Sequence, residues 1–389
     1  MKKAANILFL VVFLGFLAAV PVGTVFSDKQ GTSFWENRAL AGVPDLTVQG
    51  ILDGSFFDAV ETCFSDHIVG RDAIMELNTK AELAMGKPVV AGQVVSGDVL
   101  LDFHGYNTWD VSYQKGVALT VGERIKDLNG LVTGYGGYFC YVGVPHQYCY
   151  FSDRYPDYMD NRTWTMDNTR QVFGEAMAEL GVPFLDMMTV YDELGRPTEL
   201  YSAVDHHFTY AGALVSYESI LERINRDTGL ELTVLREGAG LELRELPNRY
   251  LGSRNREVYD LWPTVEKAGL SEVIPAIPFT RFDNGTQVPS TLYTLPETEE
   301  EYVLYGMYMG GDVAETVICT DRPELPNALI FGESFTNAVE TVFWTAFNET
   351  RSLDLRHYSA QALEEYILMY QPDVVICLRD DTMFLTDLG

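Results

Sequence analysis

Basic side chains are scarce in this chain of 389 residues: lysine and arginine together number 27, against 56 aspartates and glutamates. A formal net charge of -29 repels phosphate backbones, which argues against nucleic-acid binding. Cysteine is also sparse, with five residues, no CxxC pair and no metal-ligand spacing. An odd count without such spacing argues against a zinc site and a full disulfide framework. A neutral or weakly charged substrate suits this composition better.

Long apolar runs are absent from the sequence except near the N-terminus, where residues 4–25 follow Lys2 and Lys3. A membrane-spanning helix needs about 20 such residues, whereas a cleavable signal peptide has a core of about 7–15. We therefore expect residues 1–26 to be an uncleaved anchor, with the lysines inside the cell and the remaining chain outside. Cleavage of this segment followed by secretion is the alternative.

The pattern of the remaining chain changes along its length. Residues 27–99 read as a polar linker followed by segments of helical periodicity. From 100 to 229 and from 323 to 389, apolar strand-like runs alternate with helical segments. Residues 230–322, between these parts, are rich in Pro, Gly, Glu and Tyr and contain short β-like pieces. This segment predicts a small β-rich subdomain inserted into an α/β domain.

Continuous apolar runs at 137–144 and 373–378 predict strands that are buried on both faces. Alternation of such strands with helices predicts a parallel sheet covered by helices on both sides. The expected fold is therefore α/β: a three-layer αβα, flavodoxin-like arrangement.

One short segment has the geometry of a serine nucleophile. The apolar run 328–331 leads into Gly332, Glu333 and Ser334, and helical periodicity follows. Glycine permits a sharp turn, and a serine at a helix start lies beside unpaired N–H groups that can stabilise an oxyanion. Thr336 stands where a GxSxG elbow has its second glycine, which disfavours an ordinary α/β-hydrolase.

A serine nucleophile needs a base, and Asp205-His206-His207 supplies a candidate. Residues i and i+2 of an extended segment point the same way, so Asp205 can orient His207 while His206 points elsewhere. A surface loop with incidental histidines is the alternative. A metal site that adds Asp66 and His67 is another, but no HExxH, HxH or CxxC pattern supports it. We expect no metal and no other cofactor.

Several segments resemble the bacterial DHHW protein family, a set of exported proteins of poorly defined function. They are Glu36-Asn37-Arg38-Ala39-Leu40 with Pro44, Phe64-Ser65-Asp66-His67 with Gly70-Arg71-Asp72, Asp205-His206-His207-Phe208-Thr209, Tyr305-Gly306 with Gly310-Gly311-Asp312, and Asp354-Leu355-Arg356-His357-Tyr358. More distantly, the chain is similar to the alginate O-acetylation proteins of the AlgX/AlgJ type. This resemblance implies an SGNH-hydrolase-like fold in which a D-x-H segment precedes the serine segment.

Carried over by position, the resemblance implies Ser334 as the nucleophile, His207 as the base and Asp205 as the group that orients it. Two residues depart from the family pattern. Phe208 replaces the final Trp of the name motif and keeps an aromatic body without the indole N–H. Glu333 replaces the usual aspartate before the serine with a longer carboxylate. Neither departure removes a member of the triad.

Three further residues, Arg356, His206 and His146, are candidates for substrate binding. Arg356 follows the strand after the nucleophile helix, at a sheet end where ligands bind in such folds. A guanidinium there can hold a carbonyl, hydroxyl or carboxylate, although an ion pair with Asp354 is the structural alternative. His146 ends an earlier strand and is expected at the same edge, with a packed or solvated loop position as its alternative.

The function expected from these residues and from the resemblance is that of an extracytoplasmic O-acyltransferase or acetylesterase acting on a cell-surface polysaccharide. The serine would be acylated and would pass the acyl group to a sugar hydroxyl or to water. The resemblance to the AlgX/AlgJ type also implies a membrane-bound O-acyltransferase as the acyl donor. The alternative function is that of a non-catalytic polysaccharide-binding or assembly component that keeps the fold.

Overall fold

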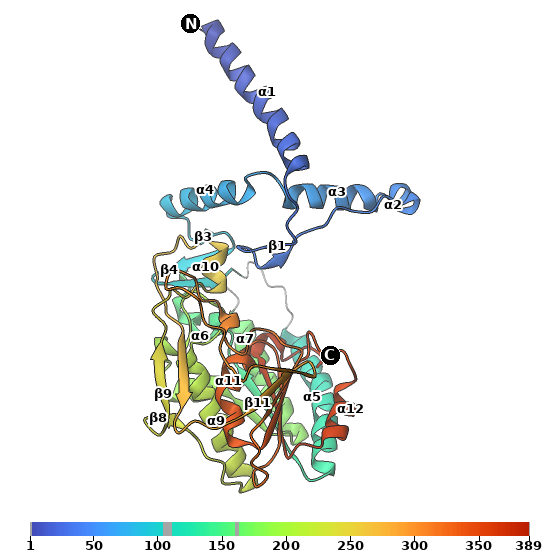
Figure 1. Ribbon diagram of the computed structural model, residues 1–389, viewed down its shortest axis with the longest axis vertical. Coiled ribbons are helices and arrows are strands. Elements are labelled where there is room, and N and C mark those ends of the chain that lie inside the picture. Colours follow the sequence, from blue (N-terminus) through green and yellow to red (C-terminus); the bar gives the residue numbers. More distant parts are fainter. Residues whose placement is uncertain (1, 104–110, 160–162, 389) are drawn as a thin grey trace. The chain divides into compact units, whose positions relative to one another are not determined.

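The computed structural model describes residues 2–103, 111–159 and 163–388, which form two compact units (Figure 1). The N-terminal unit comprises the residues up to 93 together with 255–263, and the sheet unit comprises 94–254 and the residues from 264 onward. The short return at 255–263 belongs to the N-terminal unit, where the ring of Tyr259 lies 5.3 Å from that of Trp35.

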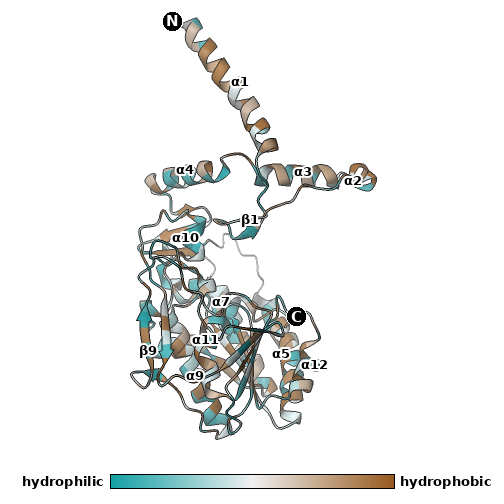
Figure 2. Cartoon of the chain, in the orientation of Figure 1, coloured by the Kyte–Doolittle hydropathy of each residue, from teal (hydrophilic) through white to brown (hydrophobic). Residues whose placement is uncertain are grey.

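The N-terminal unit begins with helix α1 (Lys2–Phe26), which is apolar along most of its length (Figure 2). Among the described residues, α1 is the one helix that is long and apolar enough to cross a membrane. Only 6% of its most apolar window is buried within the protein. Its length and exposure are those of a membrane anchor or of a signal sequence.

A small hairpin and three helices follow α1. These elements are β1 (Thr32–Ser33), β2 (Arg38–Ala39), α2 (Val48–Asp53), α3 (Ser55–Asp66) and α4 (Arg71–Ala84), followed by β3 (Val89–Val90). Gly54 separates α2 from α3 at a φ of 89°, and Gly70 precedes α4 at a φ of 74°. Both angles lie in the left-handed region that favours glycine; Gly54 thereby ends α2, and Gly70 sets the turn into α4.

The sheet unit is built on an eight-stranded sheet with the order β12-β11-β13-β15-β14-β16-β6-β7. Its strands are β6 (Tyr138–Val144), β7 (Phe184–Asp186), β11 (Thr280–Asp283), β12 (Thr286–Val288), β13 (Glu315–Cys319), β14 (Ala328–Gly332), β15 (Glu349–Asp354) and β16 (Val374–Asp380). The five strands from β15 to β7 run parallel, and β13, β11 and β12 extend this set antiparallel. The predicted α/β class with a mainly parallel sheet is confirmed.

Helices cover both faces of the sheet. Helices α5 (Val111–Gly134), α7 (Thr163–Leu180) and α12 (Leu363–Tyr370) share one buried apolar cluster with alternate strand residues, among them Leu329 and Val375. On the other face lie α9 (Tyr210–Thr228) and α11 (Phe335–Phe343), which pack against each other and on the central strands. The continuous apolar character of β14 and β16 follows from burial on both faces.

The segment 230–322, expected as one small β-rich insertion, divides into two parts. Strands β8 (Arg236–Glu237), β9 (Gly240–Glu245) and β10 (Gly269–Val273) form a separate three-stranded sheet. Strands β11 to β13 instead lengthen the central sheet. The other short elements are β4 (Gln93–Ser96), β5 (Val99–Asp102), α6 (Gln147–Tyr150), α8 (Met187–Glu193) and α10 (Ser253–Glu257), with single 3-10 turns at Ser152–Arg154, Thr198–Leu200, Tyr305–Met307, Trp344–Ala346 and Asp381–Met383.

Candidate active site

Ser334 lies between the end of β14 and the first residue of α11, at the carboxyl edge of the parallel strands. It is the N-cap residue of α11 and is partly exposed, whereas every residue of α11 is buried. Gly332 makes this approach possible, because a Cβ atom there would lie 1.8 Å from the carbonyl oxygen of Leu378 on β16. The serine therefore depends on a glycine that lets two central strands lie close together.

Asp205 and His207 lie in the loop before α9. An antiparallel bridge between Tyr201 and Phe208 closes this loop, and the Ser202 N–H donates to the His207 carbonyl oxygen at 3.2 Å. The His207 Nε2 atom lies 2.8 Å from Ser334 Oγ, and its Nδ1 atom lies 2.7 Å from Asp205 Oδ1. Since an ionised carboxylate only accepts, Nδ1 carries the proton and Nε2 is left to accept from the serine hydroxyl. The three predicted triad residues thus form one continuous hydrogen-bonded chain.

Asp205 is held by more than the histidine ring. Its Oδ1 also accepts from the His207 backbone N–H at 3.1 Å, and its Oδ2 accepts from the Ser253 N–H at 2.6 Å. Burial raises the pKa of Asp205, but the charges of His206 and His207 and these hydrogen bonds outweigh it, so the pKa lies below its usual range. Asp205 therefore stays ionised beside the ring that it orients.

Gly252 and Ser253 are positioning residues that the sequence did not point to. A Cβ atom on Gly252 would lie 2.2 Å from the Val204 carbonyl oxygen, so only glycine allows this strand-like segment to reach the Asp205 loop. The Ser253 N–H donates to Asp205, and the Ser253 hydroxyl lies 2.8 Å from His206 Nδ1. Because these residues are about 48 positions from the loop in sequence, no local pattern indicates the contact.

Aromatic side chains enclose the His207 ring. Tyr305 stacks parallel to it, with ring centroids 3.6 Å apart and an angle of 2°. Phe335, the first residue of α11, lies 4.7 Å away on a tilted plane. Phe208 is buried and makes an edge contact with Phe335 at 5.1 Å, which is the packing position expected for the last aromatic residue of the name motif. The imidazole is thereby fixed in the plane that joins Asp205 to Ser334.

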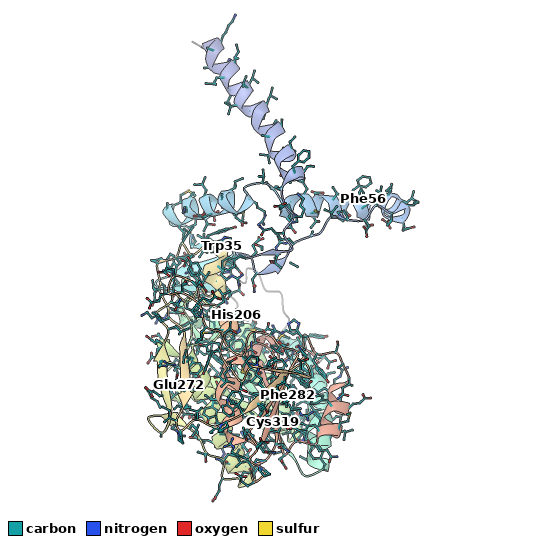
Figure 3. The ribbon with its side chains drawn as sticks, in the orientation of Figure 1. Trp35, Phe56, His206, Glu272, Phe282 and Cys319 are labelled. Carbon is teal, nitrogen blue, oxygen red and sulfur yellow. The ribbon has the colours of Figure 1, made fainter. Side chains whose placement is uncertain are left out.

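His206 and His146 lie at the more open side of the site (Figure 3 labels His206). The His206 side chain is 35% exposed and its ring lies nearly parallel to that of His146, with centroids 5.7 Å apart. Burial and the neighbouring His207 lower the pKa of His206 below its usual value, so it is neutral near pH 7. His146 begins the turn after β6, and its backbone N–H donates to Asp381 at 2.9 Å.

Arg356 follows β15 and is 41% exposed at the same edge of the sheet. Its guanidinium is paired with Asp354 at 2.6 Å and with Asp312 at 2.9 Å. Asp312 also accepts from Asn337, which lies one turn after Ser334 on α11, at 3.0 Å. The ion pair that was the structural alternative for Arg356 is therefore present, and a role in substrate binding stays a prediction.

Glu333 points away from the serine hydroxyl and toward β16. Its Oε1 accepts from Arg379 Nε at 2.6 Å, and both side chains are nearly fully buried. Burial raises the pKa of Glu333, opposed in part by the Arg379 charge. Asp380 is the last residue of β16 and Asp381 begins the 3-10 turn after it, and burial together with the Asp380 charge raises the pKa of Asp381 to about 8. Glu333, Asp380 and Asp381 are all buried.

Backbone hydrogen bonds shape the start of α11 around the serine. The Thr336 N–H donates to Glu333 and the Asn337 N–H donates to Ser334 at 3.1 Å, which turns the chain sharply into the helix. The N–H groups of Ser334 and Phe335 precede the first helical bonds, where backbone donors have no partner within the helix. They are suited to a developing negative charge on a bound acyl group.

Two groups of residues have the ligand types for a metal ion within the described ranges. Ligand atoms of Asp205, His206 and His207 lie within 4.8 Å of one another, as do those of Asp312, Asp354 and His357. Those of the first group already bond to one another, to Ser253 and to Ser334, and the two carboxylates of the second hold Arg356. Asp66 and His67, the additional ligands of the alternative metal site, belong to the N-terminal unit.

Comparison with known proteins supports the fold. Residues 36–126 match the DHHW protein family, which confirms that resemblance over this part of the chain. Comparison with curated proteins finds no match. The structure of Bacillus cereus PatB1 is 19% identical, has a TM-score of 0.61, and aligns over 75% of this chain and 96% of PatB1. A second PatB1 structure, with a sulfonyl adduct, has a TM-score of 0.60 at 18% identity, over 76% of this chain and 95% of PatB1.

A DHHW family protein from Eubacterium siraeum is 14% identical with a TM-score of 0.58, over 77% of this chain and 93% of that protein. These likenesses show a shared α/β fold. The matched family segment ends before Asp205, so the assignment of the triad depends on the hydrogen bonds among Ser334, His207 and Asp205.

Proposed function

We propose that the chain is an extracytoplasmic serine-dependent O-acyltransferase or acetylesterase that acts on a cell-surface polysaccharide. The observation that carries the proposal is the continuous chain from Ser334 Oγ through His207 to Asp205, with distances of 2.8 and 2.7 Å. Such a chain is the arrangement that activates a hydroxyl near neutral pH. The strongly acidic composition agrees with a neutral or weakly charged polymer as the acceptor.

In the first half of the proposed reaction, Ser334 Oγ attacks the carbonyl carbon of an acyl donor while His207 Nε2 takes the hydroxyl proton. The N–H groups of Ser334 and Phe335 stabilise the oxyanion, and Asp205 stabilises the imidazolium. Collapse of the intermediate gives the acyl-serine, and the leaving group departs with the proton from His207.

In the second half, a sugar hydroxyl or a water molecule attacks the acyl-serine while His207 takes its proton. The proton returns to Ser334 Oγ as the acyl group leaves, so the enzyme is regenerated. His206, His146 and Arg356 are the side chains proposed to contact the acceptor, since His206 lies beside His207, His146 lies beside His206, and Arg356 follows the neighbouring strand. We further propose that the apolar helix α1 anchors the chain, and that a membrane-bound O-acyltransferase supplies the acyl group.

Labelling and hydrolysis test the proposal on the full chain. PatB1 is described with a sulfonyl adduct, and sulfonyl fluorides react with activated nucleophiles, so phenylmethylsulfonyl fluoride is a suitable probe. We expect one adduct, mapped by mass spectrometry to Ser334, together with hydrolysis of 4-nitrophenyl acetate. Ser334→Ala should abolish both, whereas Ser290→Ala, on an exposed loop, should change neither. A wild-type chain with neither labelling nor hydrolysis would instead favour the non-catalytic binding or assembly function.

A further inference from the structure

The helices of the N-terminal unit leave many large apolar side chains exposed to solvent. Among the helices of this unit that follow α1, the most exposed are Leu52 and Val48 on α2, at 77% and 76%, and Leu77 on α4, at 68%. With them we group Ile51, Phe57, Val60 and Ile74, all at least 41% exposed, as the apolar platform. Soluble proteins rarely expose large apolar side chains on several successive helices unless a partner or a membrane covers them.

The residues of the apolar platform are spaced with the periodicity of a helix. On α2, Val48, Ile51 and Leu52 have the spacing i, i+3, i+4, which places them on one side of the helix. On α3, Phe57 and Val60 are three residues apart, as are Ile74 and Leu77 on α4. Each helix therefore presents an apolar stripe to the outside, the pattern of a helix that rests on an apolar surface.

Hydrogen bonds attach the junction of α3 and α4 to the last turn of α1. The Val69 N–H donates to Thr24 Oγ1 at 3.1 Å, and Thr24 is only 1% exposed. The Val69 side chain packs on Gly23, where an added Cβ atom would lie 3.0 Å from it. Figure 1 shows α3 and α4 leaving this junction in opposite directions, across the axis of α1. The junction of α3 and α4 thus lies at the C-terminal end of α1.

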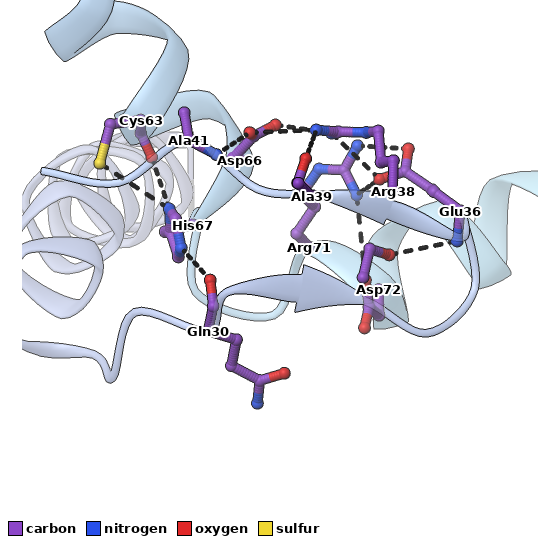
Figure 4. Close-up of polar contacts among 11 residues, drawn as sticks. Gln30, Glu36, Arg38, Ala39, Ala41, Cys63, Asp66, His67, Arg71 and Asp72 are labelled. Atoms are coloured by element: carbon purple, nitrogen blue, oxygen red, sulfur yellow. Dashed lines mark hydrogen bonds and ion pairs between the residues drawn. The ribbon is translucent and has the colours of Figure 1, made fainter. Parts of the chain in front are cut away.

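A polar cluster links the elements at this junction (Figure 4). Arg71 makes two bonds to Glu36, at 2.8 and 2.9 Å, and Arg38 binds Asp66 at 2.6 Å. The Arg38 hydrogen bond lowers the pKa of Asp66 to about 2, so this pair stays charged. The His67 ring spans from the Cys63 carbonyl oxygen to that of Gln30, at 2.8 and 3.0 Å. The cluster therefore fastens the segment after α1 and the β1–β2 hairpin to α3 and α4.

The position of the junction along α1 corresponds to the boundary of a bilayer. Thr24 lies 21 residues after Lys3, which is about 31 Å along a helix, and the hydrocarbon core of a bilayer is about 30 Å thick. We infer that the apolar platform of α2, α3 and α4 lies in the membrane–water interface at the outer end of α1. This inference rests on the proposed anchoring by α1 and is independent of the proposed chemistry at Ser334.

The charges of the platform helices indicate which lipid suits them. Residues 43–86 carry eight acidic and two basic side chains, so anionic headgroups repel this segment. The attraction is therefore apolar, and zwitterionic lipid should serve as well as anionic lipid or better. A basic interfacial helix would show the opposite preference.

The test uses the full chain in phosphatidylcholine vesicles. A cysteine is introduced as Phe57→Cys or as Thr62→Cys, two exposed positions on opposite sides of α3, and labelled with an environment-sensitive fluorophore. Cys319→Ser is the background, because Cys319 is the partly exposed native thiol and the other four are buried. Nitroxide lipids and aqueous iodide then serve as the two quenchers.

We expect the Phe57→Cys probe to shift to the blue and to be quenched severalfold more by a shallow nitroxide lipid than by a deep one. The Thr62→Cys probe should be quenched mainly by iodide, and added phosphatidylglycerol should not strengthen the difference. Equal iodide quenching at both positions would overturn the inference. So would shielding of Phe57→Cys from both quenchers, because a protein partner or a second copy would then cover the platform.

Flotation of the chain with the vesicles checks insertion of α1 in the same samples, and a chain that does not float also overturns the inference. Labelling of Ser334 by the sulfonyl fluoride is measured in parallel. Because this labelling does not depend on the membrane, failure of the platform and failure of the proposed chemistry give different results.

Discussion

Asp205→Asn is the most informative change in the candidate site. The wild-type carboxylate accepts three hydrogen bonds, from the His207 ring, the His207 N–H and the Ser253 N–H. An asparagine has one oxygen and one NH2 group, so it cannot accept on both sides. If the NH2 group faces Ser253, two donors oppose each other. If it faces His207, the ring must accept at Nδ1, and its remaining proton moves to Nε2.

The size of the loss in kcat or in stability depends on which way the asparagine amide is oriented. A proton on Nε2 points at Ser334 and removes the base, a change that costs about 10⁴-fold in kcat, or about 5 kcal/mol, at a serine–histidine–aspartate site. If the asparagine instead opposes the buried Ser253 N–H, the penalty falls on stability, by about 1–3 kcal/mol. Asp205→Asn should therefore lower kcat by up to about 10⁴-fold with a modest loss of melting temperature.

Hydrolysis of 4-nitrophenyl acetate and the rate of sulfonyl labelling measure the first effect, and thermal unfolding measures the second. Asp127→Asn, an exposed position on α5, is the matched control and should change none of these readouts. A kcat within about tenfold of the wild type, equivalent to 1.4 kcal/mol, together with an unchanged melting temperature would refute the assigned role of Asp205.

Three further predictions concern the surroundings of the triad and the polar cluster. Gly332→Ala should abolish sulfonyl labelling and lower the melting temperature, because its Cβ atom would meet the Leu378 carbonyl oxygen. The control Gly130→Ala should be tolerated, because Gly130 lies exposed on α5 and has no close neighbours. Normal labelling of Gly332→Ala would contradict the geometry. Tyr305→Ala should lower kcat about tenfold by freeing the His207 ring, since an aromatic pair contributes about 0.5–1.5 kcal/mol. Tyr305→Phe keeps the stacked ring and should therefore retain the wild-type kcat. Equal effects of the two variants would indicate a role for the hydroxyl instead. Asp66→Asn should lower the melting temperature near pH 7, with a difference from wild type that shrinks as the pH falls from about 4 toward 2. The pKa of Asp66 is lower in the folded state than in the unfolded chain, so its stabilising effect is present above about pH 4 and is lost as the carboxylate is protonated. A difference in melting temperature that grows as the pH falls would contradict this prediction.

The sequence predicts the parts of the site whose geometry is local. The i, i+2 spacing of Asp205 and His207 places both on one side of the loop, and the glycine before Ser334 follows from a buried strand that meets a helix. The contact between the loop and the serine spans 127 residues and cannot be read from spacing. The need of a serine nucleophile for a base suggests that pairing, the family resemblance supports it, and the structure places the atoms within hydrogen-bond distance.

The missed residues reach the site over long sequence separations. Ser253 contacts Asp205 from a segment that looks like part of an irregular insertion, and Tyr305 reaches His207 from the same stretch. The sequence of 230–322 carries weak periodicity, so it did not predict that β11 to β13 continue the central sheet. Their pairing with β15 depends on tertiary contacts that no local pattern records.

The four buried acids near the serine differ in charge, and this difference bears on the proposed chemistry. Asp205 has a lowered pKa and stays ionised beside His207, where a negative charge stabilises the imidazolium. Burial raises the pKa of Glu333, Asp380 and Asp381, and the value of about 8 for Asp381 keeps that carboxyl mainly protonated near pH 7. Glu333 is in addition directed toward Arg379, which offsets its charge when it ionises. Asp381 therefore adds little negative charge that would oppose an oxyanion at Ser334, and Arg379 offsets that of Glu333, although the chain as a whole is strongly acidic.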